Sequence, residues 1–319
     1  MLKKQKRKSR FARTLAAGVV LLFLAVAGAV WLWTDFGNAK HDVQSKLTSL
    51  PALLDLPAQA LAGVDVARMN LLCAQGLPGA EDLDVNRCLA TLDEMAARVR
   101  SETQRHYYRF ERNPAEFEHS EGFFRMLMLA VVLAEDFQVH YAPDKIGTAA
   151  DARMDDGFFR DAHDVFLHGL AGSSHQGTCS SLPVLQVAVG RRLGYPLSLV
   201  TTKGHLFVRW EDARERFNIE AAGHGVNRFS DDYYRHWPAE VSDAEMQAEG
   251  YLKSLTATEE LAVFLSIRGM CWREAGRYGE AMESFRAASR LAPGCQSYRL
   301  LATDFQRQTA GAMASGRMN

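Results

Sequence analysis

Several motifs that would point to common chemistry are missing from this sequence. No two cysteines are spaced as C-x-x-C, which argues against a zinc site built on thiolates. The sequence also contains no phosphate-binding glycine loop, no dinucleotide-binding fingerprint and no serine-nucleophile elbow. We therefore expect neither a cofactor nor a resident metal ion.

A net positive charge is confined to the first 13 residues of the chain. Residues 1–13 hold seven Lys and Arg side chains and no acid, so the net charge of −1 becomes −8 for residues 14–319. A mildly acidic body argues against a nucleic-acid partner. With 47% apolar and 24% charged residues over 319 positions, the composition is that of an ordinary globular protein of one large domain or two.

Charge of either sign is absent from residues 14–34, a run of 21 residues. At about 1.5 Å per residue this run spans the hydrocarbon core of a bilayer. The basic tail before it should stay cytoplasmic, so we expect a single-pass protein of the bacterial inner membrane with its body in the periplasm. The competing interpretation is a cleaved signal peptide, because Ala25–Ala27 imitates a small-residue cleavage site.

Cysteine is scarce, and its number is odd. Of the five cysteines, at least one must stay outside any disulfide within the chain. Cys73 with Cys88 and Cys271 with Cys295 are the candidate pairs, since disulfides persist in the periplasm. Buried thiols are the alternative. Both interpretations leave Cys179 by itself.

Hydrophobic periodicity predicts a largely helical body around a small sheet. Helices are predicted over residues 83–99, 122–137, 155–170 and 180–193. Strands are predicted over residues 199–201, 205–210 and 216–221. The polar link between the last two strands predicts a hairpin.

The C-terminal part matches one tetratricopeptide repeat. Counting 34 residues from Ala262 places small, aromatic and helix-stopping residues in one register. They are Gly269, Trp272, Gly276, Tyr278, Ala281, Phe285, Ala288 and Pro293. A solitary repeat cannot bury both of its faces, so we expect it to dock on the preceding part of the chain. It is also a candidate surface for a protein partner.

Cys179 is the candidate nucleophile. It begins a predicted helix, and a helix N-terminus or a nearby imidazolium favours the reactive thiolate. Gly177 allows close approach of the backbone, and N–H groups of this turn could bind a developing oxyanion, as could the side chain of Gln176. The non-functional interpretation is a small buried residue that starts a core helix.

Three histidines are candidates for the base beside Cys179. His205 follows Gly204 at the start of a strand, which suits a side chain that projects from a sheet edge. His175 is too near Cys179 in sequence for the usual helix-to-sheet geometry. His224 lies in a glycine-flanked loop, where a residue at the rim of the site or an exposed one is expected.

The third site residue is predicted from hairpin geometry. If residues 210 and 216 flank the turn, facing residue numbers sum to about 426, so that Asn218 faces Val208 and Glu220 lies near His205. The Glu220 carboxylate would then orient the imidazole and stabilise its cation. Asn218 shares the face of Glu220 and is the alternative. An ordinary polar strand face is the non-functional interpretation.

Four motifs therefore lie together in the core of the chain. They are Gly-Thr-Cys-Ser-Ser (177–181), Arg-Arg-Leu-Gly-Tyr-Pro (191–196), Gly-His-Leu-Phe-Val-Arg (204–209) and Phe-Asn-Ile-Glu (217–220). As a set they resemble the bacterial transglutaminase-like proteins of the papain-like cysteine peptidase superfamily. By this resemblance Cys179 is the nucleophile, His205 the general base and Glu220 the acidic third residue. The family usually has aspartate in the third position, so Glu220 implies a longer reach.

The resemblance implies an α+β fold. In its papain/transglutaminase-like core, the helix with the cysteine packs on a small antiparallel sheet, between a helical N-terminal region and a C-terminal helical hairpin. The implied activity is a peptidase, deamidase or transglutaminase-type acyl transfer on a peptide or protein substrate. The alternative is a catalytically inactive binding or scaffold protein of the cell envelope that uses the same fold.

The expected order of segments follows from these observations. It is a basic tail (1–13), a transmembrane helix (14–34), a stalk (35–60), a helical N-terminal part (61–165), the catalytic core (166–240), a connector (241–258), the helical tail (259–312) and a disordered end (313–319).

Two other clusters receive structural interpretations. Asp161, His163, Asp164 and His168 have metal-ligating side chains, but exposed or capping roles are commoner for such residues. The aromatic and acidic run 231–238 is expected to be a lid or packing segment.

Overall fold

The structure is a computed structural model that describes residues 47–146, 157–221 and 226–314. The chain separates into two units, Met1–Thr48 and Ser49–Asn319, and the description below concerns the second. The predicted basic tail, the predicted transmembrane helix and residues 35–46 of the predicted stalk lie outside the described residues. Within the described part, no helix has both the length and the apolar character needed to cross a membrane.

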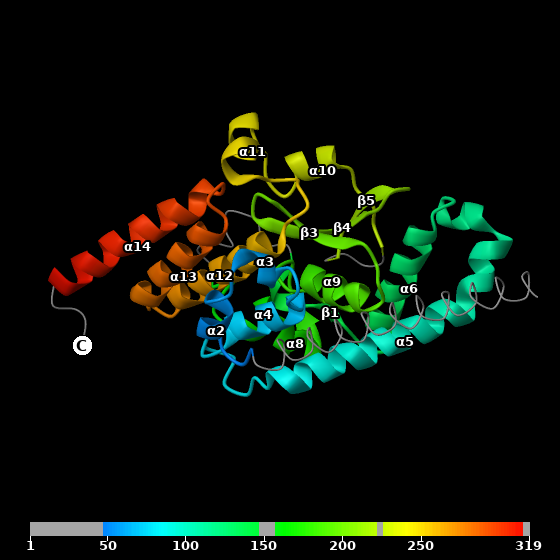
Figure 1. Cartoon of the computed structure of the whole chain (residues 1–319), viewed down its shortest axis with the longest axis horizontal. Coiled ribbons are helices and arrows are strands. Elements are labelled where there is room, and N and C mark those ends of the chain that lie inside the picture. Colours follow the sequence, from blue (N-terminus) through cyan, green and yellow to red (C-terminus); the bar gives the residue numbers. More distant parts are fainter. Residues whose placement is uncertain (1–46, 147–156, 222–225, 315–319) are drawn as a thin grey trace, which may run out of the picture. The chain divides into compact units, whose positions relative to one another are not determined.

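The described part is α+β, mostly helical, with a small antiparallel sheet and C-terminal helices (Figure 1). The α-helices are α2 (Leu50–Leu54), α3 (Ala58–Leu61), α4 (Val66–Ala74), α5 (Val85–Arg112), α6 (Glu121–Glu135), α7 (Ala162–Val165), α8 (Leu167–Ala171), α9 (Leu182–Arg192), α10 (Asp231–His236), α11 (Asp243–Glu249), α12 (Ala257–Glu274), α13 (Tyr278–Leu291) and α14 (Gln296–Ala314). Two short 3-10 helices are η1 (Pro114–Phe117) and η2 (Pro143–Lys145). The strands are β1 (His140–Tyr141), β2 (Gln176–Gly177), β3 (Leu197–Thr202), β4 (His205–Glu211) and β5 (Arg216–Ile219).

The three-stranded sheet has the order β3-β4-β5 and is antiparallel throughout. A two-residue turn joins β3 to β4, and Gly204 adopts φ +69° there, a backbone conformation that glycine tolerates best. The chain at Leu252 and Leu255 extends the free edge of β3, because their N–H groups donate to Thr201 and Leu199 at 2.9 Å. Separately, β1 and β2 form a short parallel pair just before Cys179.

The register of β4 with β5 differs by one residue from the prediction. Glu211 faces Arg216, so facing numbers sum to 427, and Asn218 faces Arg209 rather than Val208. The cause is a four-residue turn, in which the Asp212 carboxylate accepts the N–H groups of the residues at 214 and 215. The turn is therefore one residue shorter than the predicted link of residues 211–215, and Glu211 belongs to β4.

Two predicted helices also have different limits. The predicted helix 83–99 begins at Val85 and continues to Arg112, because nothing interrupts it before Pro114. The predicted helix 155–170 was wrong, since residues 162–165 and 167–171 form two short helices with an extended residue between them. There the buried Asn70 side chain accepts the Leu167 N–H at 2.9 Å, replacing a bond within the helix.

Helix α9 packs against the sheet and begins slightly later than predicted. Cys179 lies in the turn before Leu182, although the Thr178 carbonyl already accepts the Leu182 N–H at 2.9 Å. The helix ends at Arg192, and Gly194 follows with φ +79°. The thiol therefore sits at the entry to the helix, with helical bonding established behind it.

The C-terminal helices lie side by side, α12 against α13 and α13 against α14 (Figure 1). Glycine is needed at position 269 for α12 to pack closely against α13, because an added Cβ would lie 2.5 Å from the Phe285 ring. Arg268 joins α12 to α4 by donating to the carbonyls of Cys73 and Gln75 at 2.7 Å. The tail is thus packed on the body. Its last described residues, Met313 and Ala314, are helical, and the rest of the predicted disordered end lies outside the described residues.

A second contact locks the tail to the helix that follows Cys179. Arg191 of α9 forms a two-point ion pair with Glu260 of α12, at 2.6 and 3.0 Å.

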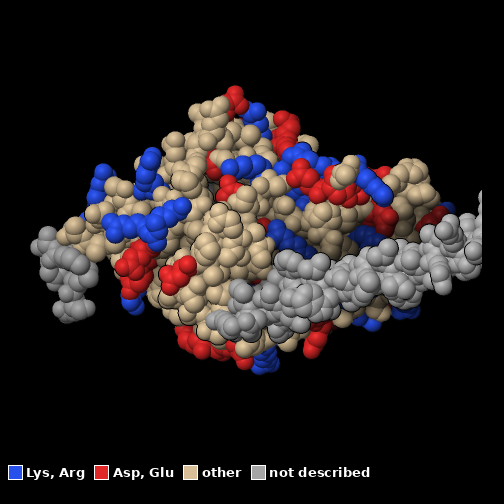
Figure 2. All heavy atoms as spheres, viewed as in Figure 1, with Lys and Arg blue, Asp and Glu red and all other residues tan. Residues whose placement is uncertain are grey.

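On the outer surface, Lys and Arg are interspersed with Asp and Glu over the face drawn in Figure 2. That face carries no extended region of a single sign among the described residues.

Candidate active site

The turn that carries Cys179 is stabilised by hydrogen bonds to one backbone carbonyl, that of Asp164. The Asp164 carbonyl accepts the hydroxyls of Thr178 and Ser181, each at 3.0 Å. Gly177 is needed beside them, because an added Cβ would lie 2.5 Å from the Ser181 hydroxyl. Residue 179 itself is only 3% exposed. The thiol is therefore fixed in a tight, buried turn.

The backbone of this turn already uses two of its N–H groups. The Thr178 N–H donates to the Ser181 hydroxyl at 3.0 Å, and the Ser180 N–H donates to the Thr178 hydroxyl at 3.3 Å. The side chain of Gln176, the other candidate oxyanion donor, donates to the Asp164 carboxylate at 3.3 Å. These three donors stabilise the turn and would have to exchange partners to bind an oxyanion.

His205 and Glu220 lie together in the interior. The His205 Nε2 is 2.8 Å from the Glu220 Oε2, and the two residues are 6% and 5% exposed. The observed register explains the contact, since positions 205, 207 and 209 share a face of β4 and Glu220 lies on the same face of the hairpin. The carboxylate reaches His205 diagonally from beside Phe207.

Cys179 completes the group. The Cys179 side chain lies near enough to His205 to act on the pKa of its ring, as Glu220 does, and both Cys179 and His205 line one cavity. Since Glu220 takes Nε2, the ring nitrogen left for the thiol is Nδ1, which is buried and has no hydrogen-bond partner among the described residues. The structure thus brings the three residues together in the order thiol, imidazole and carboxylate.

This group favours the cationic form of the imidazole. Burial by itself lowers the pKa of His205, but the neighbouring Cys179 side chain and the Glu220 carboxylate outweigh burial and raise the pKa to about 9. At neutral pH the ring is therefore an imidazolium. Such a neighbour stabilises a thiolate, which is the nucleophilic form of cysteine.

Aromatic residues of the 231–238 segment cover the imidazole. Trp237 meets the His205 ring edge-on at 4.7 Å between centroids, and the Tyr234 hydroxyl donates to Glu220 at 3.1 Å. Tyr234 also stacks on Phe207 at 3.7 Å. The segment was expected only to be a lid or packing element. Its Tyr-Tyr pair and following Trp were the visible signal for these two site residues.

Asn218, the alternative third residue, belongs to another network. It accepts from the Arg209 Nε at 2.8 Å and donates to the Asp231 carboxylate at 2.7 Å. Asp231 also binds the Arg209 and Arg216 guanidinium groups at 2.6 and 2.8 Å. These bonds anchor the start of α10 on the sheet and so hold Tyr234 in place.

The remaining histidines and the acidic cluster take other positions. His175 has the left-handed φ of 51°, and His224 lies outside the described residues. Asp161 caps α7, while His168 contacts the carbonyl of residue 79 at 2.9 Å. In the part of the chain that the structure describes, no group of three His, Cys, Asp or Glu side chains is arranged to hold a metal ion.

The other four cysteines differ from Cys179 in their surroundings. No disulfide joins any of the five cysteines, all of which are described, so the proposed pairs are not present in this structure. Burial raises the pKa of Cys73 to about 12 and the pKa of Cys88 and Cys295 to about 11. Burial also raises the pKa of Cys271. No described histidine contributes to the pKa of any of these four thiols.

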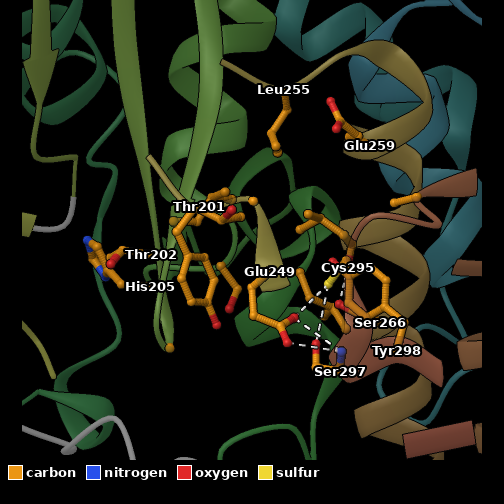
Figure 3. Close-up of a pocket in the computed structure, with 18 of the residues that line it drawn as sticks. Thr201, Thr202, His205, Glu249, Leu255, Glu259, Ser266, Cys295, Ser297 and Tyr298 are labelled. Carbon is orange, nitrogen blue, oxygen red and sulfur yellow. Dashed lines mark hydrogen bonds between the residues drawn. The ribbon is translucent and has the colours of Figure 1, made fainter. Parts of the chain in front are cut away.

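A cavity of about 370 Å³ opens beside the thiol. Cys179 and His205 lie on its wall, and so do residues of α12, α13 and α14. Figure 3 shows His205 on one side and the group of Glu249, Cys295 and Ser297 on the other. Sequence reasoning missed this participation of the tail, because its residues lie about a hundred positions from Cys179.

No protein-family model, curated protein or solved structure matches the chain.

Proposed function

We propose that this chain is a thiol enzyme that acts on amide or acyl bonds, with a papain/transglutaminase-like core. The observation that carries the proposal is the buried group of Cys179, His205 and Glu220 beside a cavity. Its support is chemical: a thiol next to an imidazolium that a carboxylate stabilises is the arrangement of an activated nucleophile. The four sequence motifs support the same family resemblance.

The proposed reaction has two halves. The Cys179 thiolate attacks the carbonyl carbon, a carbon–sulfur bond forms, and the leaving amine takes a proton from the His205 imidazolium as the carbon–nitrogen bond breaks. In the second half, neutral His205 takes a proton from water or from an amine, which attacks the thioester. The carbon–sulfur bond then breaks, and the thiolate and imidazolium are restored. Glu220 orients the ring and balances its charge in both halves.

Water and amine acceptors lead to different products, which are those of a peptidase or deamidase and of a transglutaminase-type transfer. The proposed substrate is a peptide or protein. The uncharged run 14–34 supports a single-pass anchor in a bacterial inner membrane, with the body in the periplasm. The helical tail is the proposed contact for any protein partner.

Acylation of the thiol provides the direct test. The purified full-length chain is treated with p-nitrophenyl acetate at neutral pH, and the modified residue is identified by peptide mapping. We expect rapid acetylation of Cys179 and release of p-nitrophenol, with no rapid reaction in Cys179→Ala. Cys295→Ala is the matched control, because Cys295 lines the same cavity and burial raises its pKa to about 11.

The outcome also separates the enzyme from a catalytically inactive binding or scaffold protein. Such a protein keeps the fold and the cavity but does not need a reactive thiol. Equal labelling of the wild type and Cys179→Ala, or acetylation confined to Cys295, would overturn the enzymatic proposal.

A further inference from the structure

The cavity beside Cys179 is mostly apolar on the side of the C-terminal helices. Ile267 and Met270 of α12, Phe285 of α13 and Leu301 of α14 lie on its wall. Its volume of about 370 Å³ falls in the range of small-molecule sites. It also equals about a dozen water molecules at about 30 Å³ each, which is room for an aliphatic chain of several carbons.

Charge in the cavity is unevenly balanced. Lys253 and Glu259 both line the cavity and pair with each other at 2.9 Å. Glu249 lines it too, and its carboxylate accepts the Ser297 N–H at 3.2 Å and the Cys295 thiol at 3.0 Å. No Lys, Arg or His side chain forms an ion pair with Glu249 among the described residues. One negative charge therefore lacks a cation.

Glu249 lines the same cavity as Cys179, so one ligand can contact both residues. In Figure 3 the Glu249 group and His205 lie on different sides of the cavity, with Thr201 and Thr202 toward His205. A ligand that reaches from the thiol to Glu249 must cross the intervening space, whose wall is largely apolar. A carboxylate in such surroundings is stabilised by a ligand cation, because the attraction is stronger there than in water.

We propose that the cavity binds the part of the substrate next to its reacting carbonyl and selects an aliphatic chain with a cationic end, which pairs with Glu249. The orientation toward Cys179 rests on the proposed function, whereas the ligand preference rests on the cavity alone. The helical tail is accordingly a wall of the substrate site. A lysine side chain of a polypeptide and the aminoalkyl chain of a small amide share the required chemistry.

Binding of simple probes tests the preference without any reaction. The full-length Cys179→Ala chain is titrated by calorimetry with hexylammonium, hexanol and hexanoate. We expect hexylammonium to bind at least about tenfold more tightly than hexanol, as a charged hydrogen bond contributes more than a neutral one, and hexanoate to bind most weakly. Equal or tighter binding of hexanol or hexanoate would overturn the proposal.

Two pairs of variants locate the binding. Glu249→Gln should weaken hexylammonium about tenfold and leave hexanol unchanged, while Glu283→Gln, an exposed change on α13 outside the cavity, should alter neither. Gly294→Phe should weaken both probes, since residue 294 lines the cavity and an added Cβ there meets no atom within 4 Å. Gly279→Phe is its control, because residue 279 has equal space but lies outside the cavity. Unchanged hexylammonium affinity in Glu249→Gln contradicts the inference.

The source of the cation is distinguished by a second pair of probes, acetyl-lysine N-methylamide and its norleucine counterpart. Preferential binding of the lysine probe over its norleucine counterpart supports a polypeptide side chain, and a cation preference seen only with hexylammonium supports the aminoalkyl chain of a small amide. Failure of this inference and failure of the proposed function give different results. A chain that binds hexylammonium but is never acylated at Cys179 would overturn only the function, and one that is acylated without cation preference would overturn only the inference.

Discussion

Replacing Glu220 with glutamine tests whether the negative charge of Glu220 keeps His205 protonated. Glu220→Gln keeps the size of the side chain and an oxygen that can accept from the His205 Nε2, now 2.8 Å away. The Tyr234 hydroxyl, which donates to Glu220 at 3.1 Å, can still find an acceptor. The substitution therefore removes a negative charge and changes the packing little.

The expected magnitude follows from the balance that sets the pKa of His205. Burial lowers this pKa, whereas Cys179 and Glu220 raise it, with a net value of about 9. Without the Glu220 charge only Cys179 opposes burial, so we expect a pKa near or below the ordinary value of 6.5. A fall of that size corresponds to about 3 kcal/mol of lost stabilisation, and the imidazolium fraction at about pH 7.5 drops to roughly one tenth.

The assay is the rate at which iodoacetamide alkylates Cys179, followed by peptide mapping over a pH series. At about pH 7.5 Glu220→Gln should react at least about tenfold more slowly than the wild type. Tyr234→Phe is the matched control, because it removes one neutral hydrogen bond and keeps the charge. We expect it to change the rate by less than about fivefold. The reasoning is refuted if Glu220→Gln and Tyr234→Phe have the same pH–rate profile as the wild type.

The same group predicts how stability varies with pH. Since the pKa of His205 in the folded chain is raised to about 9 from 6.5, its contribution is complete below pH 6.5 and is lost as the pH rises through about 9. Over this window the free energy of unfolding should fall by about 3 kcal/mol more in the wild type than in Glu220→Gln. The buried thiols have raised pKa values and lose their contributions only above pH 9. Urea unfolding at a series of pH values measures the difference, and parallel curves would contradict it.

Two further predictions concern the packing around the site. Arg191→Met should cost about 3–5 kcal/mol, because Glu260 is only 1% exposed and loses its cation, whereas Glu260→Gln should cost about 1–2 kcal/mol, since the 36% exposed Arg191 side chain can reach water. Urea unfolding compares them, and equal losses would count against a buried, unpaired carboxylate. Gly269→Ala should cost about 1–3 kcal/mol, because its methyl group would lie 2.5 Å from the Phe285 ring, while Gly279→Ala, with open space, should gain up to about 1 kcal/mol. The two melting temperatures check this, and shifts in the same direction would exclude the steric argument.

Much of the helical content could be predicted from local patterns. Apolar residues at spacings of three and four predicted the helix after Asp84, and small and aromatic residues predicted the pairing at Gly269. The break at Phe166 could not be predicted, because it depends on the side chain of Asn70, almost a hundred residues earlier. Periodicity reports what a segment favours by itself, whereas such capture of a backbone group depends on the folded chain.

The candidate site divides in the same way. Residue type, spacing and a family resemblance together singled out Cys179, His205 and Glu220, because a thiol at a helix start, a histidine at a strand start and an acid on the next strand match, as a set, the triad of a thiol enzyme. Only the tertiary structure decided that Tyr234 and Trp237 cover the imidazole, that Asn218 faces Arg209, and that C-terminal helices wall the cavity. The physical reason is range. Chemical identity is a property of each residue, while register, burial and cavities arise from contacts between segments that sequence distance does not reveal.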